Sequence, residues 1–384
     1  MRLHRVPWRS IQRTGSLNQL VTAARAGNYS RLTIARDGIV KYREPLGIAG
    51  NTSAAAAFIP ALIGQKWYWV PEIDLIALPG CVFTTQHSVP IFKNFLVCDE
   101  LEYNSDVRSL GGFIDSQQDG LTLNGAVQDR IRQAAWVPEG TLFVHPRFHQ
   151  NYTHWHTEAL TQLDVIGAIA GSVGAIGVPR LQGFKRASVD LWGDPGKPVV
   201  ELTEPAYRTA LGFVLTHSLF RTWLHPATAR ALKRLRSAAH ARVGVQDAAA
   251  RYPVYLSRQD SKFRPVGNEA DVCAALAARG FRIVIASELT FEEQARTFAE
   301  ASLIVSPHGS GLTNMIYARP ETPVLELRPM HAKGRSPFFD RSWTPPETPN
   351  AGMRGRRAVH GRPPRGGMAG ITVLRDPGRG ADGG

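Results

Sequence analysis

Residues 306–314, with the sequence SPHGSGLTN, carry groups that could bind a phosphate. The segment holds His308, Gly309, Gly311, Thr313 and Asn314. A glycine lets the backbone approach a ligand without a Cβ in the way, and the N–H groups at the start of a helix attract anions. We therefore expect the two glycines and the amides near Thr313 to hold a diphosphate, with His308 and Asn314 beside it. The alternative, an ordinary glycine turn between strand and helix, is disfavoured by the crowding of polar side chains.

A basic loop follows an apolar run that ends at Ser257. It contains Arg258, Lys262 and Arg264, and Asn268 follows it at the expected start of a helix. A guanidinium group binds phosphate oxygens through two parallel hydrogen bonds, so Arg258 and Arg264 are predicted to neutralise the diphosphate. Glu326 lies in an apolar run, where a carboxylate is costly unless paired, and we expect a ribose hydroxyl or an arginine as its partner. The alternatives are a solvated basic loop and a strand-end charge that faces water.

A third motif, NYTHWHTE at residues 151–158, carries acid–base chemistry. His154 and Glu158 are four residues apart, so on a helix they share one face and can form a hydrogen bond. A carboxylate that orients and charges an imidazole produces a general base near neutral pH, which makes these two residues the catalytic candidates. His145 and His149 raise zinc as an alternative, but the spacing fits no standard zinc pattern and we predict no metal. The other alternative is that these histidines only pack at the start of the helix.

Strands and helices that must position the basic loop, the 306–314 segment and Glu326 alternate along residues 251–327. We predict strands at 254–257, 281–286, 303–306 and 324–327, and helices at 269–280, 290–301 and 312–318, with capping by Asn268 and by the Thr290–Glu293 pair. Such alternation predicts a parallel sheet with right-handed crossovers. The 306–314 segment and the basic loop would then lie at the carboxyl ends of parallel strands, where open α/β sheets bind ligands. Residues 1–240 read as another α/β region, with a helix over 151–166 and a long basic helix over 227–243.

The composition of the chain limits the possible functions but does not identify one. The chain of 384 residues has a formal net charge of +13, and ten Lys and Arg residues against four Asp and Glu fall after residue 330. The sequence after residue 343 is rich in Pro, Gly and Arg, which predicts disorder. Three cysteines without metal spacing indicate a reducing compartment, and the first twenty residues show no signal peptide. We expect a soluble, cytoplasmic protein that can touch the anionic inner face of a membrane through its charge.

The three motifs, in this order, resemble those of glycosyltransferase family 61. The matching positions are Asn151, Tyr152, His154, Trp155, Glu158, Tyr255, Leu256, Ser257, Arg258, Arg264, Asn268, Glu269, Glu293, Gln294, Pro307, His308, Gly309, Gly311, Leu312, Asn314 and Glu326. His156 and Ser310 depart from the pattern, which usually has an apolar residue and an alanine there. The resemblance implies a GT-B fold, with two Rossmann-like domains around a cleft, and inverting transfer from a nucleotide sugar without an essential metal. The family also includes bacterial members of a capsular-polysaccharide type, which this chain resembles.

Together these observations predict an acceptor-side domain over residues 1–240, a nucleotide-sugar domain over 241–335 and a disordered tail over 336–384. The donor would be a nucleotide sugar, UDP-linked, with no further cofactor, and the acceptor a glycan or another hydroxyl compound. One alternative is a non-catalytic relative that binds a nucleotide sugar or a polysaccharide. The other is a nucleic-acid-binding protein, which the absence of a basic stripe with interleaved aromatic residues disfavours.

Overall fold

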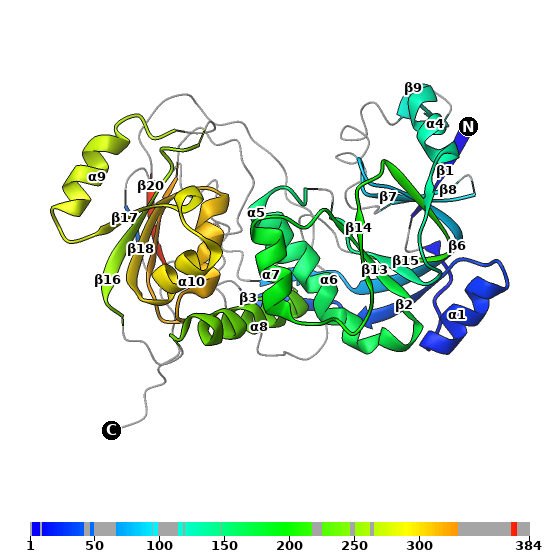
Figure 1. Cartoon of the computed structure of the whole chain (residues 1–384), viewed down its shortest axis with the longest axis horizontal. Helices are drawn as coiled ribbons and strands as arrows, with labels where there is room; N and C mark the ends of the chain where they lie inside the picture. Colours follow the sequence, from blue (N-terminus) through cyan, green and yellow to red (C-terminus); the bar gives the residue numbers. More distant parts are fainter. Residues whose placement is uncertain are drawn as a thin grey trace. The chain divides into compact units, whose positions relative to one another are not determined.

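The computed structural model describes residues 2–7, 10–41, 47–49, 67–93, 95–98, 114–117, 120–146, 148–216, 225–245, 250–261, 265–328 and 370–374. The chain divides into two compact units (Figure 1). Unit 1 comprises Met1–Gly38 and Pro71–Ala231, and unit 2 comprises Ile39–Val70 and Leu232–Gly384. The expected mixed α/β class is confirmed in both units, while the domain boundary at residue 240 stays a prediction.

Unit 1 is built on one large mixed sheet. Its strands are β1 (Arg2–Pro7), β2 (Ser30–Ala35), β6 (Ile73–Thr84), β7 (Val89–Phe92), β8 (Phe95–Cys98), β9 (Ile114–Gln117), β10 (Gly120–Leu123), β11 (Ala135–Trp136), β12 (Thr141–Phe143), β13 (Ala175–Pro179), β14 (Val199–Leu202) and β15 (Ala206–Leu215). The order is β14-β13-β12-β15-β6-β7-β8-β1-β10-β9, with β2 also on β6 and β11 also on β15. Its core gathers β-branched and aromatic side chains, and the rings of Phe83 and Phe143 stack at 4.4 Å between centroids.

The part of this sheet that matters for the site is parallel. Strands β14, β13, β12 and β15 pair in parallel, while β15 pairs antiparallel with the long strand β6. The chain runs from β12 outward to β13 and β14 and then returns to β15 on the other side of β12. The helices of this unit are α1 (Leu17–Arg25), α4 (Gly125–Arg132), α5 (Tyr152–His154), the π-helical turn η3 (Trp155–Ala159), α6 (Leu160–Val165), the 3-10 turns η4 (Ile166–Ala168) and η5 (Ala170–Ser172), and α7 (Phe184–Trp192).

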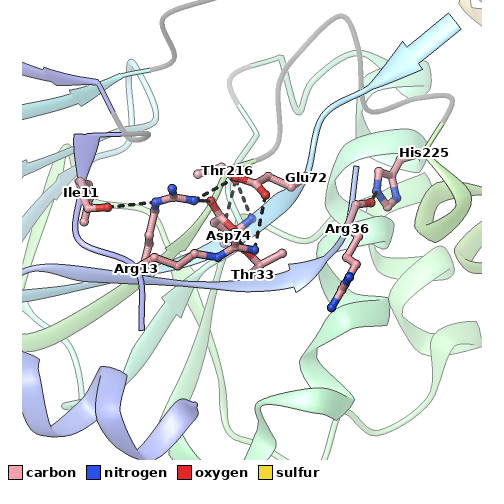
Figure 2. Close-up of polar contacts among 9 residues, drawn as sticks. Ile11, Arg13, Thr33, Arg36, Glu72, Asp74, Thr216 and His225 are labelled. Atoms are coloured by element: carbon pink, nitrogen blue, oxygen red, sulfur yellow. Dashed lines mark hydrogen bonds and ion pairs between the residues drawn. The ribbon is translucent and has the colours of Figure 1, made fainter. Parts of the chain in front are cut away.

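A buried ion pair ties β2 to β6 in this unit. Arg31 Nη1 lies 2.5 Å from Asp74 Oδ2 and 3.0 Å from Glu72 Oε1, and Thr33 donates to Asp74 Oδ1 at 2.6 Å. The Asp74 backbone N–H donates to Thr216 Oγ1 at 2.8 Å, and the carboxylate itself is fully buried (Figure 2). Because every charge here has a partner of opposite sign or a hydroxyl, the network can be buried without an unpaired charge.

The division between the units falls within α8 (Pro226–Val243), the long basic helix that the sequence predicts. His225 caps its first turn, because its Nδ1 accepts from the Ala227 N–H at 3.0 Å while Nε2 lies 2.9 Å from the carbonyl of Arg36 (Figure 2). These two contacts require a neutral imidazole with its proton on Nε2. Burial accordingly lowers the pKa of His225.

Unit 2 contains the predicted parallel sheet. Its strands are β4 (Gly47–Ala49), β16 (Tyr252–Ser257), β17 (Arg282–Ile285), β18 (Ala301–Pro307), β19 (Val324–Arg328) and β20 (Gly370–Leu374), in the order β17-β16-β18-β19-β20-β4, and β3 (Gly38–Lys41) pairs separately with β5 (Trp67–Val70). Strands β17, β16, β18 and β19 are parallel, as predicted, and β20 and β4 add antiparallel strands. The helices are α9 (Glu269–Ala277), η7 (Ala286–Glu288), α10 (Phe291–Ala299) and η8 (Ser310–Tyr317). Figure 1 shows α9 and α10 on opposite sides of the sheet, as two right-handed crossovers in opposite directions require.

Several expectations for unit 2 need correction. The prediction of a wholly disordered tail over 336–384 is wrong for residues 370–374, which form β20 beside β19; the apolar and β-branched sequence GITVL explains the strand. The Thr290–Glu293 capping box is confirmed. Asn268 is the N-cap residue of α9, as predicted, but its side chain makes no capping hydrogen bond. The expected helix over 312–318 starts two residues earlier and is a 3-10 helix.

Among the residues described above, none forms a helix that is both long and apolar enough to cross a bilayer.

Candidate active site

The first group of candidate residues lies where the strand order of unit 2 reverses. From β16 the chain moves to β17 on one side and then crosses to β18 on the other, so β16 and β18 are neighbours that diverge. Arg258 directly follows β16, and His308 and Gly309 directly follow β18. The carboxyl ends of two such strands form the crevice in which open α/β sheets bind ligands. The sequence-based expectation that these loops share one edge of the sheet is confirmed.

Arg258 and Gly309 are in direct contact at this crevice. A Cβ placed on Gly309 would lie 2.6 Å from Cζ of Arg258 and would overlap its Nη1. Gly309 has φ 168°, an extended conformation that any residue can adopt, so the glycine is not needed for a tight turn. The guanidinium group that lies against Gly309 leaves no room for a Cβ, and the expected approach of a ligand to this glycine stays a prediction.

Glu269 anchors the loop that carries Arg258 through hydrogen bonds. The Arg258 N–H donates to Glu269 Oε1 at 2.7 Å, and the Tyr255 hydroxyl donates to the same oxygen at 3.1 Å. Arg258 Nη2 also donates to Ser261 Oγ at 2.8 Å. Glu269 is buried at the first position of α9. Sequence reasoning missed its positioning role, although a charged residue at the start of a helix, close in sequence to a basic loop, was an available signal.

His308 and Glu326 form a second feature of the same edge. His308 Nδ1 lies 2.5 Å from Glu326 Oε1. His308 directly follows β18, and Glu326 lies on the neighbouring parallel strand β19. Glu326 is fully buried, and His308 is 9% exposed. His308 supplies the partner that this carboxylate was expected to need. A ribose or an arginine as a further partner of Glu326 stays a prediction.

The remaining donor-side candidates differ in burial, and one of them lies outside the described residues. Asn314 is buried and donates through Nδ2 to Gln294 Oε1 at 2.9 Å, which joins η8 to α10. Thr313 is also buried, and because η8 begins at Ser310, the N–H groups without an acceptor inside the helix are those of Ser310 and Gly311 rather than those near Thr313. Asn268 is exposed at the start of α9, and Arg264 with Lys262 lies outside the described residues. A donor-binding role for each of these residues stays a prediction.

The catalytic candidates of unit 1 occupy one continuous helical segment. Asn151 Oδ1 caps its start by accepting from the Thr153 and His154 amides at 2.9 and 3.3 Å. His154 Nδ1 lies 2.5 Å from Glu158 Oε1, which confirms the predicted contact. Residues 155–159 form a π-helical turn, a local widening that often occurs at functional sites. Burial raises the pKa of Glu158, against the opposing effect of His154, while the imidazole remains partly exposed.

Further basic groups surround this helix. Ser88 Oγ lies 2.8 Å from His145 Nδ1, the rings of His145 and His149 lie 4.4 Å apart, and Lys185 Nζ is 3.4 Å from His149 Nδ1. Burial lowers the pKa of His145 to about 3 and that of His149 to about 4. In the described part of the chain, no group of three or more His, Cys, Asp or Glu residues is arranged to hold a metal ion. Sequence reasoning did not connect Lys185 with the two histidines.

The family comparison identifies the class of the protein: the chain is a glycosyltransferase. Residues 152–325 match the family model described as Glycosyltransferase 61. The match starts in the helix with His154 and Glu158 and includes Arg258 and the 306–314 segment, and it ends one residue before Glu326. It therefore supports the resemblance to this family that the three motifs indicate. No curated protein matches the chain.

Proposed function

We propose that the protein transfers a sugar from a UDP-linked nucleotide donor to a hydroxyl acceptor, with inversion at the anomeric carbon and without a metal. The observation that carries this proposal is the contact of Arg258 with Gly309 at the strand reversal of unit 2. It presents a guanidinium group at the crevice where such sheets bind nucleotides. In this proposal the two units are the Rossmann-like domains of a GT-B fold, and unit 2 binds the donor.

On the donor side, cationic groups replace the metal. Arg258 forms two hydrogen bonds to the diphosphate oxygens, and the free N–H groups at the start of η8 bind the same group. His308, held in place by the buried carboxylate of Glu326, offsets part of this charge by donating a further hydrogen bond to the diphosphate. These groups stabilise the negative charge that develops on the diphosphate as it leaves, because charge stabilisation by fixed groups costs no reorganisation during the reaction.

On the acceptor side, His154 acts as the general base. An acceptor hydroxyl oxygen forms a bond to the anomeric carbon while the bond from that carbon to the diphosphate oxygen breaks. The hydroxyl proton passes to Nε2 of His154, and the electron pair of the broken bond leaves with the diphosphate. Glu158 holds the other nitrogen and stabilises the imidazolium that forms. One displacement of this kind inverts the anomeric configuration.

The acceptor is proposed to be a glycan or another hydroxyl compound in the synthesis of surface or capsular polysaccharide. We place this reaction in the cytoplasm, at the inner face of the membrane, because the net charge of +13 favours anionic surfaces. A second candidate is a relative that binds a nucleotide sugar or polysaccharide without catalysis. It is favoured by the sequence after residue 343, which departs from an ordinary globular composition.

One experiment separates these functions. Hydrolysis and transfer are measured over a panel of nucleotide sugars, and binding of UDP and of RNA is measured in parallel by calorimetry. We expect UDP binding and turnover with at least one donor, and no comparable RNA affinity. Donor binding without hydrolysis or transfer would establish the binder, and RNA binding without UDP binding would overturn both proposals.

A further inference from the structure

A buried lysine of unit 1 lies at the same sheet edge as the His154 helix. Strands β12 and β13 are parallel neighbours, so the residues after them meet at one edge. His145 and His149 follow β12, and Lys185 is the second residue of α7, which follows β13. Lys185 is only 2% exposed. Its Nζ lies 6.0 Å from the ring centroid of Trp155, the residue directly after His154.

The surroundings of Lys185 do not neutralise its charge. No described carboxylate forms an ion pair with it within 4 Å, and its hydrogen bond is to a neutral acceptor, His149 Nδ1, at 3.4 Å. Glu201 contributes attraction from further away, but its two oxygens already accept from the Leu181 N–H at 3.1 Å and from Arg186 Nη2 at 2.5 Å. A buried ammonium group without a counter-ion is costly, and fold stability alone would favour an apolar residue here.

We propose that Lys185, with His149 and His145, forms a subsite for an acidic group of the acceptor, either a carboxylate or a phosphate. An anion at this point would provide the negative charge that the described residues around Lys185 lack, and Nζ would donate to it the hydrogen bonds that these residues leave open. His149 would orient Nζ toward it. That the anion belongs to the acceptor rests on the proposed function, because Trp155 links the subsite to the general base His154 along one helix.

Binding of small probes to the full chain tests this subsite. The probes are methyl glucuronide for a carboxylate, inorganic phosphate for a phosphate, and methyl glucoside as the neutral match. Each is titrated by calorimetry in the presence of saturating UDP, so that the donor site is filled. We expect at least one acidic probe to bind and the glucoside not to bind. Binding of neither acidic probe to the wild-type chain would overturn the subsite.

Three variants locate the site. Lys185→Met and His149→Ala should each weaken the acidic probe by about 10- to 100-fold, the range for a hydrogen bond to a charged group. Lys185→Arg, which keeps the charge, should weaken it far less. Unchanged UDP affinity and melting temperature show that a variant is folded, and His149→Ala decides the question if Lys185→Met does not fold. Acidic probe affinity equal to wild type in a folded variant would exclude the proposal. If the probe depends on Lys185 but UDP never binds, the subsite stands and the proposed function fails.

Discussion

The guanidinium group of Arg258 lies against the backbone of Gly309 so closely that a Cβ at position 309 would overlap Nη1. Two loops that are fifty residues apart in sequence are thus fitted to each other at the strand reversal of unit 2. A side chain at position 309 must displace Arg258, even though the extended backbone of Gly309 would itself accept any residue.

Gly309→Ala should therefore have the effect of losing Arg258. We expect it to weaken UDP binding by about 1.5–3 kcal/mol, as should Arg258→Ala, because each removes hydrogen bonds to a charged group. The double variant should be little worse than either single one, since both changes remove the same interaction. Gly267→Ala is the matched control, because a Cβ there meets no atom within 4 Å. Calorimetry that shows wild-type affinity for Gly309→Ala would remove Arg258 from the phosphate site.

The His154–Glu158 pair predicts a separation of binding from turnover. A general base acts only when the acceptor loses its proton, so His154→Ala should leave donor affinity unchanged and lower transfer by about 10²–10⁴. Glu158→Gln should lower transfer less, because it orients the imidazole and does not receive the proton. Wild-type transfer in both variants would show that the helix is structural.

The sequence predicted unit 2 well because its signals are local. Strands of β-branched residues and the Thr290–Glu293 capping box each depend on a few neighbouring residues, and both occur as expected. The contact of His154 with Glu158 was predictable for the same reason, since four residues on a helix fix their distance.

What the sequence did not predict depends on contacts between distant segments. Glu326 contacts His308, and Glu269 accepts a hydrogen bond from the Arg258 N–H. Each pairing follows from the order of the strands rather than from spacing in the sequence. The cluster of Lys185 with His149 likewise requires β12 and β13 to be parallel neighbours. The short strand β20 was missed because the Pro, Gly and Arg-rich composition of the surrounding region obscures a segment of only five residues.

Strand β20 gives a prediction about stability. It pairs with β19 over five residues and with β4 over three, so its loss would leave β19 without this neighbour. A chain truncated after residue 364 should melt at a lower temperature than a chain truncated after residue 374, which keeps β20. Both are compared by calorimetric scanning at equal concentration. Equal melting temperatures for the two truncations would mean that β20 does not contribute to the stability of the sheet.

Removal of metal tests the cationic mechanism. If Arg258 and His308 neutralise the leaving diphosphate, then EDTA should leave turnover nearly unchanged, and added manganese should not increase it. The measurement is the initial rate of donor turnover before and after dialysis against the chelator. Loss of activity that manganese restores would assign the leaving group to a metal and contradict the mechanism proposed for these residues.

The buried histidines predict that the protein loses stability in mild acid. Burial lowers the pKa of His145 to about 3 and those of His149 and His156 to about 4, while a histidine in the unfolded chain has a pKa of about 6.5. Below pH 6.5 the unfolded chain therefore binds protons that the folded chain does not. Stability should fall as the pH decreases from 6.5 toward 4, by up to about 1.4 kcal/mol per pH unit for each fully buried histidine.

His156→Phe isolates one of these contributions. His156 is fully buried, its Nδ1 lies 2.7 Å from the carbonyl of Tyr152, and its ring lies 4.1 Å from the Tyr152 ring, so phenylalanine keeps the aromatic contact and loses the hydrogen bond. At pH 7.5 the variant should be less stable by about 0.5–1.5 kcal/mol. Its free energy of unfolding in urea should then fall less steeply than that of wild type between pH 6.5 and 5, because the variant lacks the titrating group. Parallel slopes for the two proteins would show that His156 is protonated in the folded state and does not cause the loss of stability in acid.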